Sequence, residues 1–325
     1  MKSKLPLVVI VGPTGVGKTE LSIHLAHKYD GEVVNGDSLQ VYRSLDIGTG
    51  KIKPQEMEGV PHHLLDILSV EEDFNASDFK ILASQAIEEI YSRGKLPFLV
   101  GGTGLYVEGL LYDLEFGQDG SHDPLVRKQL ERELQKQGGQ AVWNKLKRLD
   151  PAAAEKIPLA NERRLIRALE VIEVTGEQFS KQDNHRRQVS RYNELILVLN
   201  RDRQVLYNRI NQRVVGMVAE GLEEEAEFLF NKDTSDKSQV FQSMKGIGYK
   251  EWWPYFQGVE AKEDVIQQIQ QNSRRYAKRQ LTWFRNRFKH THWLNMDQDL
   301  EQVLLESQIL INTLVDKTNQ DSCRR

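Results

Sequence analysis

The sequence is almost free of cysteine: Cys323 is the single one among 325 residues. One cysteine forms no internal disulfide and builds no cysteine-based metal site, which excludes disulfide-stapled secreted domains and favours a reducing, cytoplasmic setting. Long apolar runs are also missing, since none approaches the roughly 20 residues of a membrane-spanning helix, so we expect no membrane association. The short run over residues 5–11 leads into a glycine-rich motif instead of a cleavage site. We therefore interpret it as a first strand and not as a signal peptide.

Acidic residues are absent from one stretch near the C-terminal end. No aspartate or glutamate lies between Asp264 and Asp297, although the net charge of the whole chain is −3. Such local concentration of positive charge favours contact with a polyanion, and the alternative is an ordinary solvated helix face. The basic residues of the stretch are Arg274, Arg275, Lys278, Arg279, Arg285, Arg287 and Lys289.

Apolar runs alternate with amphipathic patterns in the first third of the chain. Short apolar runs over residues 5–11, 32–35 and 97–100 predict buried strands, and the patterns over 18–29 and 76–93 predict helices between them. Alternation of this kind predicts an α/β fold with a P-loop NTPase-like parallel sheet. Ligands of such sheets bind at the carboxyl ends of the strands.

The middle of the chain changes character. Residues 115–191 show helical patterns and no convincing strand, and an apolar run at 195–199 then resumes the sheet. We therefore predict a catalytic core from residues 1–114 and 192–325, and a helical insertion domain from residues 115–191. The C-terminal region is expected to be helical, with a frayed polar tail at 316–325. The predicted helices lie at 124–137, 140–149, 161–175, 203–221, 223–231 and 263–288.

The most specific motif directly follows the first strand. Its residues are Gly12, Pro13, Thr14, Gly15, Val16, Gly17, Lys18 and Thr19, and they match the P-loop pattern of nucleotide-binding proteins. Glycines let backbone N–H groups close around phosphate oxygens, and the following helix adds its positive N-terminal dipole. Lys18 supplies a cation for the phosphates, and the Thr19 hydroxyl is a candidate ligand for Mg²⁺.

A carboxylate follows the second predicted strand. Asp37 stands where a general base would meet a substrate, although capping of the next helix is an equally good interpretation. Thr103, after the third strand, lies at the same edge of the sheet and is a candidate to orient Asp37 through a hydrogen bond. The third strand ends in glycines without the acidic metal ligand of a conventional NTPase. This absence argues against a motor or a switch protein.

Several segments together resemble one family, the tRNA dimethylallyltransferases, also called tRNA isopentenyltransferases. They extend in order from residue 5 to about residue 293: GPTGVGKTEL, NGDSLQVYRSLDIGTGK, GVPHHLLD, LVGGTGLYVEGLL, RRLIRALEV, NRINQRVVGMVAEGLEEE, MKGIGYKE and KRQLTWFRNR. The resemblance implies transfer of a dimethylallyl group from dimethylallyl diphosphate to N6 of the adenosine 3′ of the tRNA anticodon. It also implies Mg²⁺ as cofactor.

The resemblance assigns roles to the residues found above. The P-loop would hold the diphosphate of the prenyl donor instead of ATP, and Arg213 would reach the same diphosphate. The catalytic set would be Asp37, Thr103, Lys18 and Arg213, with Asp37 accepting a proton or hydrogen bond from the adenine amine.

RNA contact then accounts for the basic stretch. A flipped-out adenosine of the anticodon stem-loop would meet residues near Asp37, and arginines of the insertion would contact the rest of the tRNA. Aromatic residues among the basic ones are candidates for base stacking, but packing of the helix is the more ordinary explanation. No protein partner is implied, so we expect a monomer. The tRNA-binding candidates are Asp37, Ser38, Leu39, Gln40, Arg127, Arg163, Arg164, Arg167, Lys278, Arg279, Gln280 and Arg285.

Two rival functions remain open from sequence. A nucleoside or nucleotide kinase shares the P-loop core but has little use for a basic C-terminal helix. A non-catalytic RNA-binding module leaves the P-loop unexplained. The chain departs from the usual family pattern at residues 50–54 and 159–162, which puts local contacts there in doubt.

Overall fold

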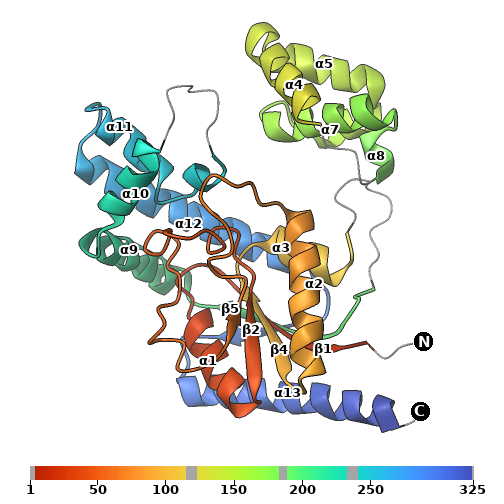
Figure 1. Ribbon diagram of the computed structural model, residues 1–325, viewed down its shortest axis with the longest axis vertical. Coiled ribbons are helices and arrows are strands. Elements are labelled where there is room, and N and C mark those ends of the chain that lie inside the picture. Colours follow the sequence, from red (N-terminus) through yellow and green to blue (C-terminus); the bar gives the residue numbers. More distant parts are fainter. Residues whose placement is uncertain (1–3, 115–122, 183–188, 233–240, 324–325) are drawn as a thin grey trace. The chain divides into compact units, whose positions relative to one another are not determined.

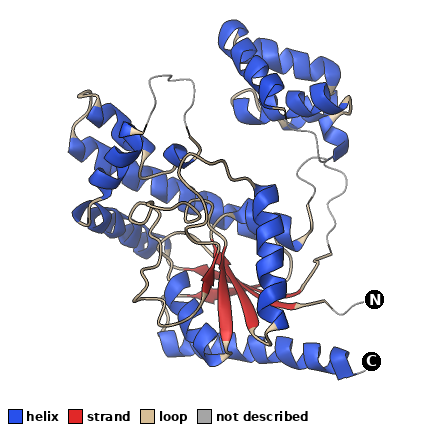
Figure 2. Cartoon of the chain, in the orientation of Figure 1, coloured by secondary structure: helices blue, strands red, loops and turns tan. Residues whose placement is uncertain are grey.

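A computed structural model describes residues 4–114, 123–182, 189–232 and 241–323. Its core is a six-stranded, wholly parallel sheet. Figures 1 and 2 show helices on both sides of this sheet, so the predicted α/β class is confirmed. The strands are β1 (Pro6–Val11), β2 (Gly31–Asn35), β3 (His62–His63), β4 (Leu96–Gly101), β5 (Asn193–Asn200) and β6 (Thr291–Asn295).

The sheet has the strand order β3-β2-β4-β1-β5-β6, which puts β1 in its interior. Every residue of β1 is buried, because a central parallel strand is covered by helices on both faces. This double burial is why its sequence is a continuous apolar run instead of an alternating one. The same holds for most of β2, β4 and β5, the other strands that the sequence predicted.

Helices pack on each face of the sheet. On one face, α1 contacts β1, β2 and β4, and α13 contacts β1 and β5; on the other, α2 contacts β2, β4 and α3. A side-chain amide starts α2, since Asn75 accepts from the backbone of Ser77 and Asp78 in a capping box. The helices of the core are α1 (Lys18–Lys28), α2 (Ala76–Ser92), α3 (Gly104–Leu111), α9 (Arg203–Ala219), α10 (Leu222–Asn231), α11 (Trp253–Phe256), α12 (Lys262–Arg287) and α13 (Leu300–Cys323), with 3-10 turns at Ser243–Lys245 and Lys250–Trp252.

The chain divides into two compact units, one of residues 1–111 and 190–325 and one of residues 112–189. The second unit has its own apolar core, in which Leu130, Leu146, Leu165 and Leu169 are fully buried. A separate core is what defines an independent folding unit. Its helices are α4 (Pro124–Gln137), α5 (Gly139–Leu149), α6 (Pro151–Lys156), α7 (Glu162–Thr175) and α8 (Phe179–Gln182).

Several short helices and the two edge strands of the sheet were not predicted from the sequence. The short edge strand β3 and the edge strand β6 lack a continuous apolar run, and in β6 Leu294 is the one buried residue. An edge strand is covered less than a central one, so its sequence carries a weaker signal. The predicted frayed tail is wrong, because α13 continues to Cys323. No helix in the described ranges is both long and apolar enough to cross a membrane.

Candidate active site

The P-loop joins β1 to α1 and needs glycine at several positions. A Cβ at Gly12 would lie 2.8 Å from the Leu199 carbonyl oxygen of the neighbouring strand, so no side chain fits there. Gly15 and Gly17 have φ of 76° and 110°, and Gly17 is the N-cap of α1. Val16 is fully buried and anchors the loop to the core. The backbone therefore presents the N-terminus of α1 at the carboxyl end of β1.

Two cations lie together at this loop. The Lys18 ammonium donates to the carbonyl oxygens of Gly12 (3.0 Å) and Pro13 (2.9 Å), and Arg213 Nη1 donates to Thr14 Oγ1 (3.2 Å). Burial, and then the nearby charge of Arg213, lowers the pKa of Lys18 to about 8, while Asp37 opposes the shift. Burial also lowers the pKa of Arg213.

Neither Lys18 nor Arg213 forms an ion pair within the residues that the structure describes. Two desolvated cations side by side repel each other and lack the hydration that would stabilise them in water. A bound anion would relieve both penalties. The structure therefore brings the predicted P-loop residues and Arg213 together as a candidate anion site.

Asp37 follows β2 at the same edge of the sheet. Its backbone N–H donates to Asn35 Oδ1 (3.1 Å), and its Oδ1 accepts from the Leu39 N–H (3.0 Å). The carboxylate thus stabilises a turn, and the capping of a following helix is not observed, because residues 38–44 form turns and a single bridge. Within the described residues Asp37 Oδ2 accepts no hydrogen bond, which leaves one oxygen for a substrate.

Thr103 acts on the backbone beside Asp37 and not on its carboxylate. Thr103 Oγ1 accepts from the Ser38 N–H at 3.1 Å and lies 3.5 Å from Ser38 Oγ, and the Thr103 N–H donates to the Gly36 carbonyl oxygen at 3.3 Å. The predicted direct hydrogen bond between Thr103 and Asp37 is absent from the described contacts. Thr103 instead holds the residues on either side of Asp37 in place.

Gln280 of α12 ties the P-loop to the turn after β4. Its Oε1 accepts from the Thr14 N–H (3.1 Å), its Nε2 donates to the Gly102 carbonyl oxygen (2.9 Å), and the side chain is 5% exposed. The structure thus gives Gln280 an internal role, where the sequence predicted contact with tRNA.

Tyr276 was not predicted as part of the site. Burial, and then the charge of Asp37, raises the pKa of Tyr276 to about 12, while the nearby side chains of Thr103, Arg279 and Gln280 oppose the shift. The phenol therefore stays protonated beside the candidate base. Its position four residues before Gln280 on α12 places both side chains on one helix face, and this spacing was the available signal.

The other predicted residues of the adenosine site, Ser38, Leu39 and Gln40, lie in the loop that follows Asp37. Gln40 Nε2 donates to the carbonyl oxygens of Thr49 (3.2 Å) and Gly50 (3.4 Å). Leu39 packs against the turn at Gly246, where an added Cβ would lie 2.7 Å from Leu39 Cδ1. Ser38, Leu39 and Gln40 are all half-buried. The structure places them next to Asp37, as predicted.

One departure from the family pattern has a structural role. The buried Lys51 ammonium donates to the Tyr42 carbonyl oxygen (2.8 Å) and to the carboxylates of Asp46 and Asp66 (both 2.6 Å). All three ammonium protons are used in these hydrogen bonds, so Lys51 fixes the loop that carries Tyr42 and Asp46 to the segment at Asp66. The other departure, at residues 159–162, lies at the start of α7.

The basic stretch forms an exposed stripe on α12. Arg275, Lys278, Arg279 and Arg285 are exposed and recur at helical spacing. Phe284 and Phe288 are buried, with ring centroids 5.8 Å apart, so the packing interpretation holds for these two aromatics. The stripe thus presents cations to solvent while the aromatic face packs on the core.

The predicted tRNA contacts of the helical unit start from α4 and α7. Arg127 and Arg167 both donate to Glu170 Oε2, at 3.3 Å and 3.0 Å, and Glu170 is fully buried. Arg163 is exposed and Arg164 half-exposed at the start of α7. Arg127 also pairs with Glu131 on α4 (3.2 Å), so carboxylates of the helical unit hold both Arg127 and Arg167.

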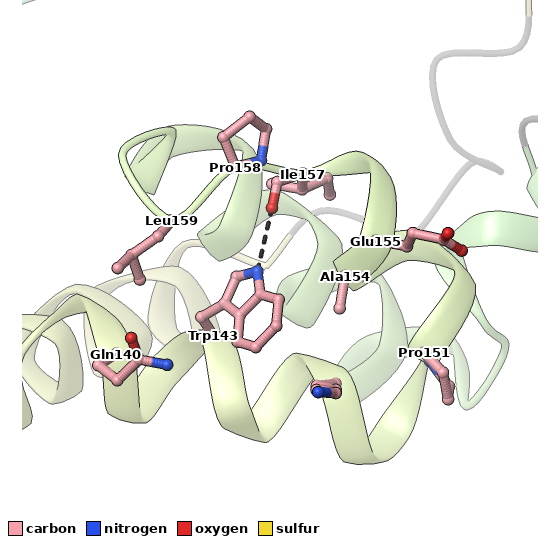
Figure 3. A pocket seen from close by; sticks show the side chains of 9 residues that line it. Gln140, Trp143, Pro151, Ala154, Glu155, Ile157, Pro158 and Leu159 are labelled. Carbon is pink, nitrogen blue, oxygen red and sulfur yellow. Dashed lines mark hydrogen bonds between the residues drawn. The ribbon is translucent and has the colours of Figure 1, made fainter.

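A groove of about 580 Å³ in the helical unit lies among α5, α6 and the segment that follows α6 (Figure 3). Trp143 lines it and donates from Nε1 to the Ile157 carbonyl oxygen at 3.0 Å, as the dashed line in Figure 3 shows. None of the predicted site residues lines this groove. We therefore attach no chemistry to it.

The sequence matches the model of the IPP transferase family over residues 40–287. The chain belongs to this family. It is similar to the tRNA dimethylallyltransferase of Bacillus pumilus, with 48% identity over 91% of each chain, and to that of Bacillus subtilis, with 45% identity over 94% of this chain and 96% of the other.

Solved structures agree with this membership of the IPP transferase family. A tRNA isopentenylpyrophosphate transferase from Bacillus halodurans has a TM-score of 0.73 and 45% identity, covering 98% of this chain and 99% of the other. A eukaryotic dimethylallyltransferase described as acting on tRNA has a TM-score of 0.79 and 33% identity, covering 92% and 75%. The parallel-sheet fold is therefore that of the family.

Proposed function

We propose that this member of the family transfers a dimethylallyl group from dimethylallyl diphosphate to N6 of the adenosine immediately 3′ of a tRNA anticodon, with release of diphosphate. The observation that carries the proposal is the similarity to tRNA dimethylallyltransferases along more than nine-tenths of the chain. Lys18 and Arg213 support the proposal as well, because two adjacent cations are suited to bind a diphosphate.

The donor would place its diphosphate against the P-loop. The bond between the allylic carbon and the diphosphate oxygen breaks in the reaction, and its electron pair leaves with the diphosphate. Lys18 and Arg213 lack carboxylate partners in the described residues, so they are suited to neutralise the charge that grows on this leaving group. The backbone N–H groups at the start of α1 add to this stabilisation.

The acceptor would place its N6 amine beside Asp37. The amine nitrogen forms the new bond to the allylic carbon and loses one proton, which Asp37 Oδ2 accepts. The amine is conjugated with the purine and is a poor nucleophile, so a positioned base lowers the barrier. Thr103 keeps Asp37 in place through its hydrogen bonds to Ser38 and Gly36, on either side of the carboxylate.

Magnesium is proposed as the cofactor. The described residues hold no cluster of three His, Cys, Asp or Glu side chains, and Thr19 offers one exposed hydroxyl at the start of α1. This donor set fits Mg²⁺, which is commonly held by few protein oxygens together with substrate phosphates and water. Bound there through Thr19, the ion would offset negative charge on the diphosphate.

Transfer RNA is the proposed macromolecular partner. The exposed stripe on α12 and the arginines of α4 and α7 provide cations for its phosphates. We propose that the enzyme acts in the cytoplasm, which the near-absence of cysteine favours, and that it acts as a monomer.

The proposal is tested by incubating the full chain with Mg²⁺, unmodified tRNA and dimethylallyl diphosphate labelled in its prenyl group. Label on the tRNA is the expected result. Binding of tRNA without transfer of label would favour a non-catalytic RNA-binding module. Consumption of ATP in the presence of nucleosides, with no transfer of label, would favour the kinase.

A further inference from the structure

A glutamate outside the predicted site accepts four hydrogen bonds. Glu225 of α10 accepts through Oε2 from the N–H groups of Asp46 (2.8 Å) and Ile47 (2.9 Å). Through Oε1 it accepts from the Gly48 N–H (2.9 Å) and the Tyr249 hydroxyl (2.6 Å). Three successive backbone donors on one carboxylate fix the conformation of this loop, because charge-assisted hydrogen bonds are the stronger kind.

The other partner of Glu225 is itself held in place. Tyr249 is fully buried, and its burial together with the charge of Glu225 keeps the pKa of its hydroxyl well above the usual value, so the hydroxyl is a donor. A Cβ on Gly48 would lie 2.6 Å from the Tyr249 ring, so the loop touches this ring directly. Glu225 and Tyr249 together hold the loop against the core.

The far end of this loop forms a wall of the candidate active site. A Cβ on Gly50, which has φ of 57°, would lie 1.6 Å from Arg213 Nη2, so the backbone of Gly50 packs directly on the guanidinium. The Gly50 carbonyl oxygen also lies 3.5 Å from Nη2. Gln40 donates to the Thr49 and Gly50 carbonyl oxygens of the same loop. The loop at residues 46–50 therefore positions both Arg213, the cation proposed for the diphosphate, and Gln40 of the predicted adenosine site.

We infer that Glu225 is a positioning residue that acts through the loop at residues 46–50 to hold Arg213 against the P-loop. The inference rests on the proposed function, because it takes the P-loop and Arg213 as the diphosphate site. Arg213 has no carboxylate partner in the described residues, so its direction depends on Thr14 and on the Gly50 backbone. Loss of the Glu225 carboxylate frees three N–H groups and lets the loop move away from the guanidinium.

The test measures binding of inorganic pyrophosphate with Mg²⁺ to E225Q, R213A and the double variant. A glutamine keeps the size of the side chain but replaces one acceptor oxygen by a donor group, which opposes the backbone N–H groups. We expect E225Q to weaken pyrophosphate binding about tenfold. In the R213A background the same change should add no further loss, because coupled residues are not additive. E227Q changes an exposed glutamate of the same helix and is the matched control.

A further tenfold loss from E225Q in the R213A background would overturn the inference, as would unchanged binding by folded E225Q. If E225Q does not fold, G50A tests the same link without touching Glu225. Its new Cβ must displace Arg213, so pyrophosphate binding should weaken in the natural background and stay unchanged beside R213A. Equal binding by G50A and the natural protein would contradict the role of the loop. Pyrophosphate binding without transfer of prenyl label would refute the proposed prenyl transfer but keep the diphosphate site, which is the part of the proposed function that this inference needs.

Discussion

At the scale of single residues, the sequence predicted which residues lie together better than it predicted their hydrogen-bond partners. Lys18, Arg213 and Asp37 lie together as predicted, since the P-loop and the strand ends fix their positions. The partner of Thr103 was predicted less well, because its hydroxyl bonds Ser38 and not the carboxylate. Tyr276 was missed because its spacing from Gln280 places it on the same helix face but does not separate a site tyrosine from a packing one. Such pairings depend on which helix reaches the sheet edge, and this is decided by tertiary packing.

The pKa of Lys18 leads to a pH dependence of diphosphate binding. Below about pH 8 the free lysine is protonated and the cation is ready; above it the lysine is neutral and must take up a proton when the anion binds. We expect pyrophosphate affinity to fall above pH 8 by up to about tenfold per pH unit from this residue alone. Titration calorimetry in buffers of different ionisation enthalpy measures the proton uptake. The K18M variant lacks the titrating amine, so its pH profile reports the titration of pyrophosphate itself. Equal pH profiles for K18M and the unaltered protein would refute the assignment of the pH dependence to Lys18.

At the scale of elements, apolar periodicity located the central strands and most of the long helices. The edge strands of the sheet and the C-terminal end of the chain were predicted less well. Strands β1 and β5 are buried on both faces and therefore give clear apolar runs. Strand β6 pairs only with β5 and buries little, so its sequence resembles a loop. The long helix α12 was predicted within one residue at each end. Its attachment to the P-loop through Gln280 was not, because a buried glutamine has no sequence signature.

The attachment of α12 should contribute measurably to stability. Replacing Gln280 by alanine leaves the Thr14 N–H and the Gly102 carbonyl oxygen without their present partner. We expect Q280A to lower the free energy of unfolding by roughly 1–3 kcal/mol, the cost of buried unsatisfied groups. Urea unfolding measures it, with Q271A at an exposed position of the same helix as control. Equal stability of Q280A and Q271A would show that the two hydrogen bonds contribute nothing.

The exposed stripe of α12 should act on tRNA and not on the prenyl donor. We expect K278A/R279A to bind tRNA more weakly and to reduce the slope of log affinity against log salt by about 2, if both cations meet phosphates. Binding titrations at several salt concentrations provide the slope. K317A, at an exposed position of α13, should leave it unchanged. An unaltered slope in the double variant would argue against phosphate contact by this stripe.

At the scale of the whole molecule, two separate cores were predictable because the strand pattern stops near residue 115 and resumes near residue 193. The division at residues 111–112 and 189–190 lies within a few residues of the predicted boundaries. Each unit buries its own apolar residues, so a surface change in one should not unfold the other. The sequence contained no information on the groove of the helical unit, which depends on how α5 and α6 pack.

The two units should contribute to function separately. We expect R163A/R164A, in the helical unit, to weaken tRNA binding about tenfold or more while pyrophosphate binding stays the same, because the P-loop lies in the other unit. Parallel titrations with tRNA and with pyrophosphate measure both. Equal loss of the two affinities would mean that the change acts through folding and not through RNA contact.

Transfer of labelled dimethylallyl groups to unmodified tRNA by D37A, measured beside the unaltered chain, tests the account most directly. The account predicts that the unaltered chain labels N6 of the adenosine 3′ of the anticodon. The variant should lose at least about a hundredfold in turnover while still binding tRNA, because the base takes part in the chemical step. Full turnover by D37A, or label on another position of the tRNA, would contradict the account.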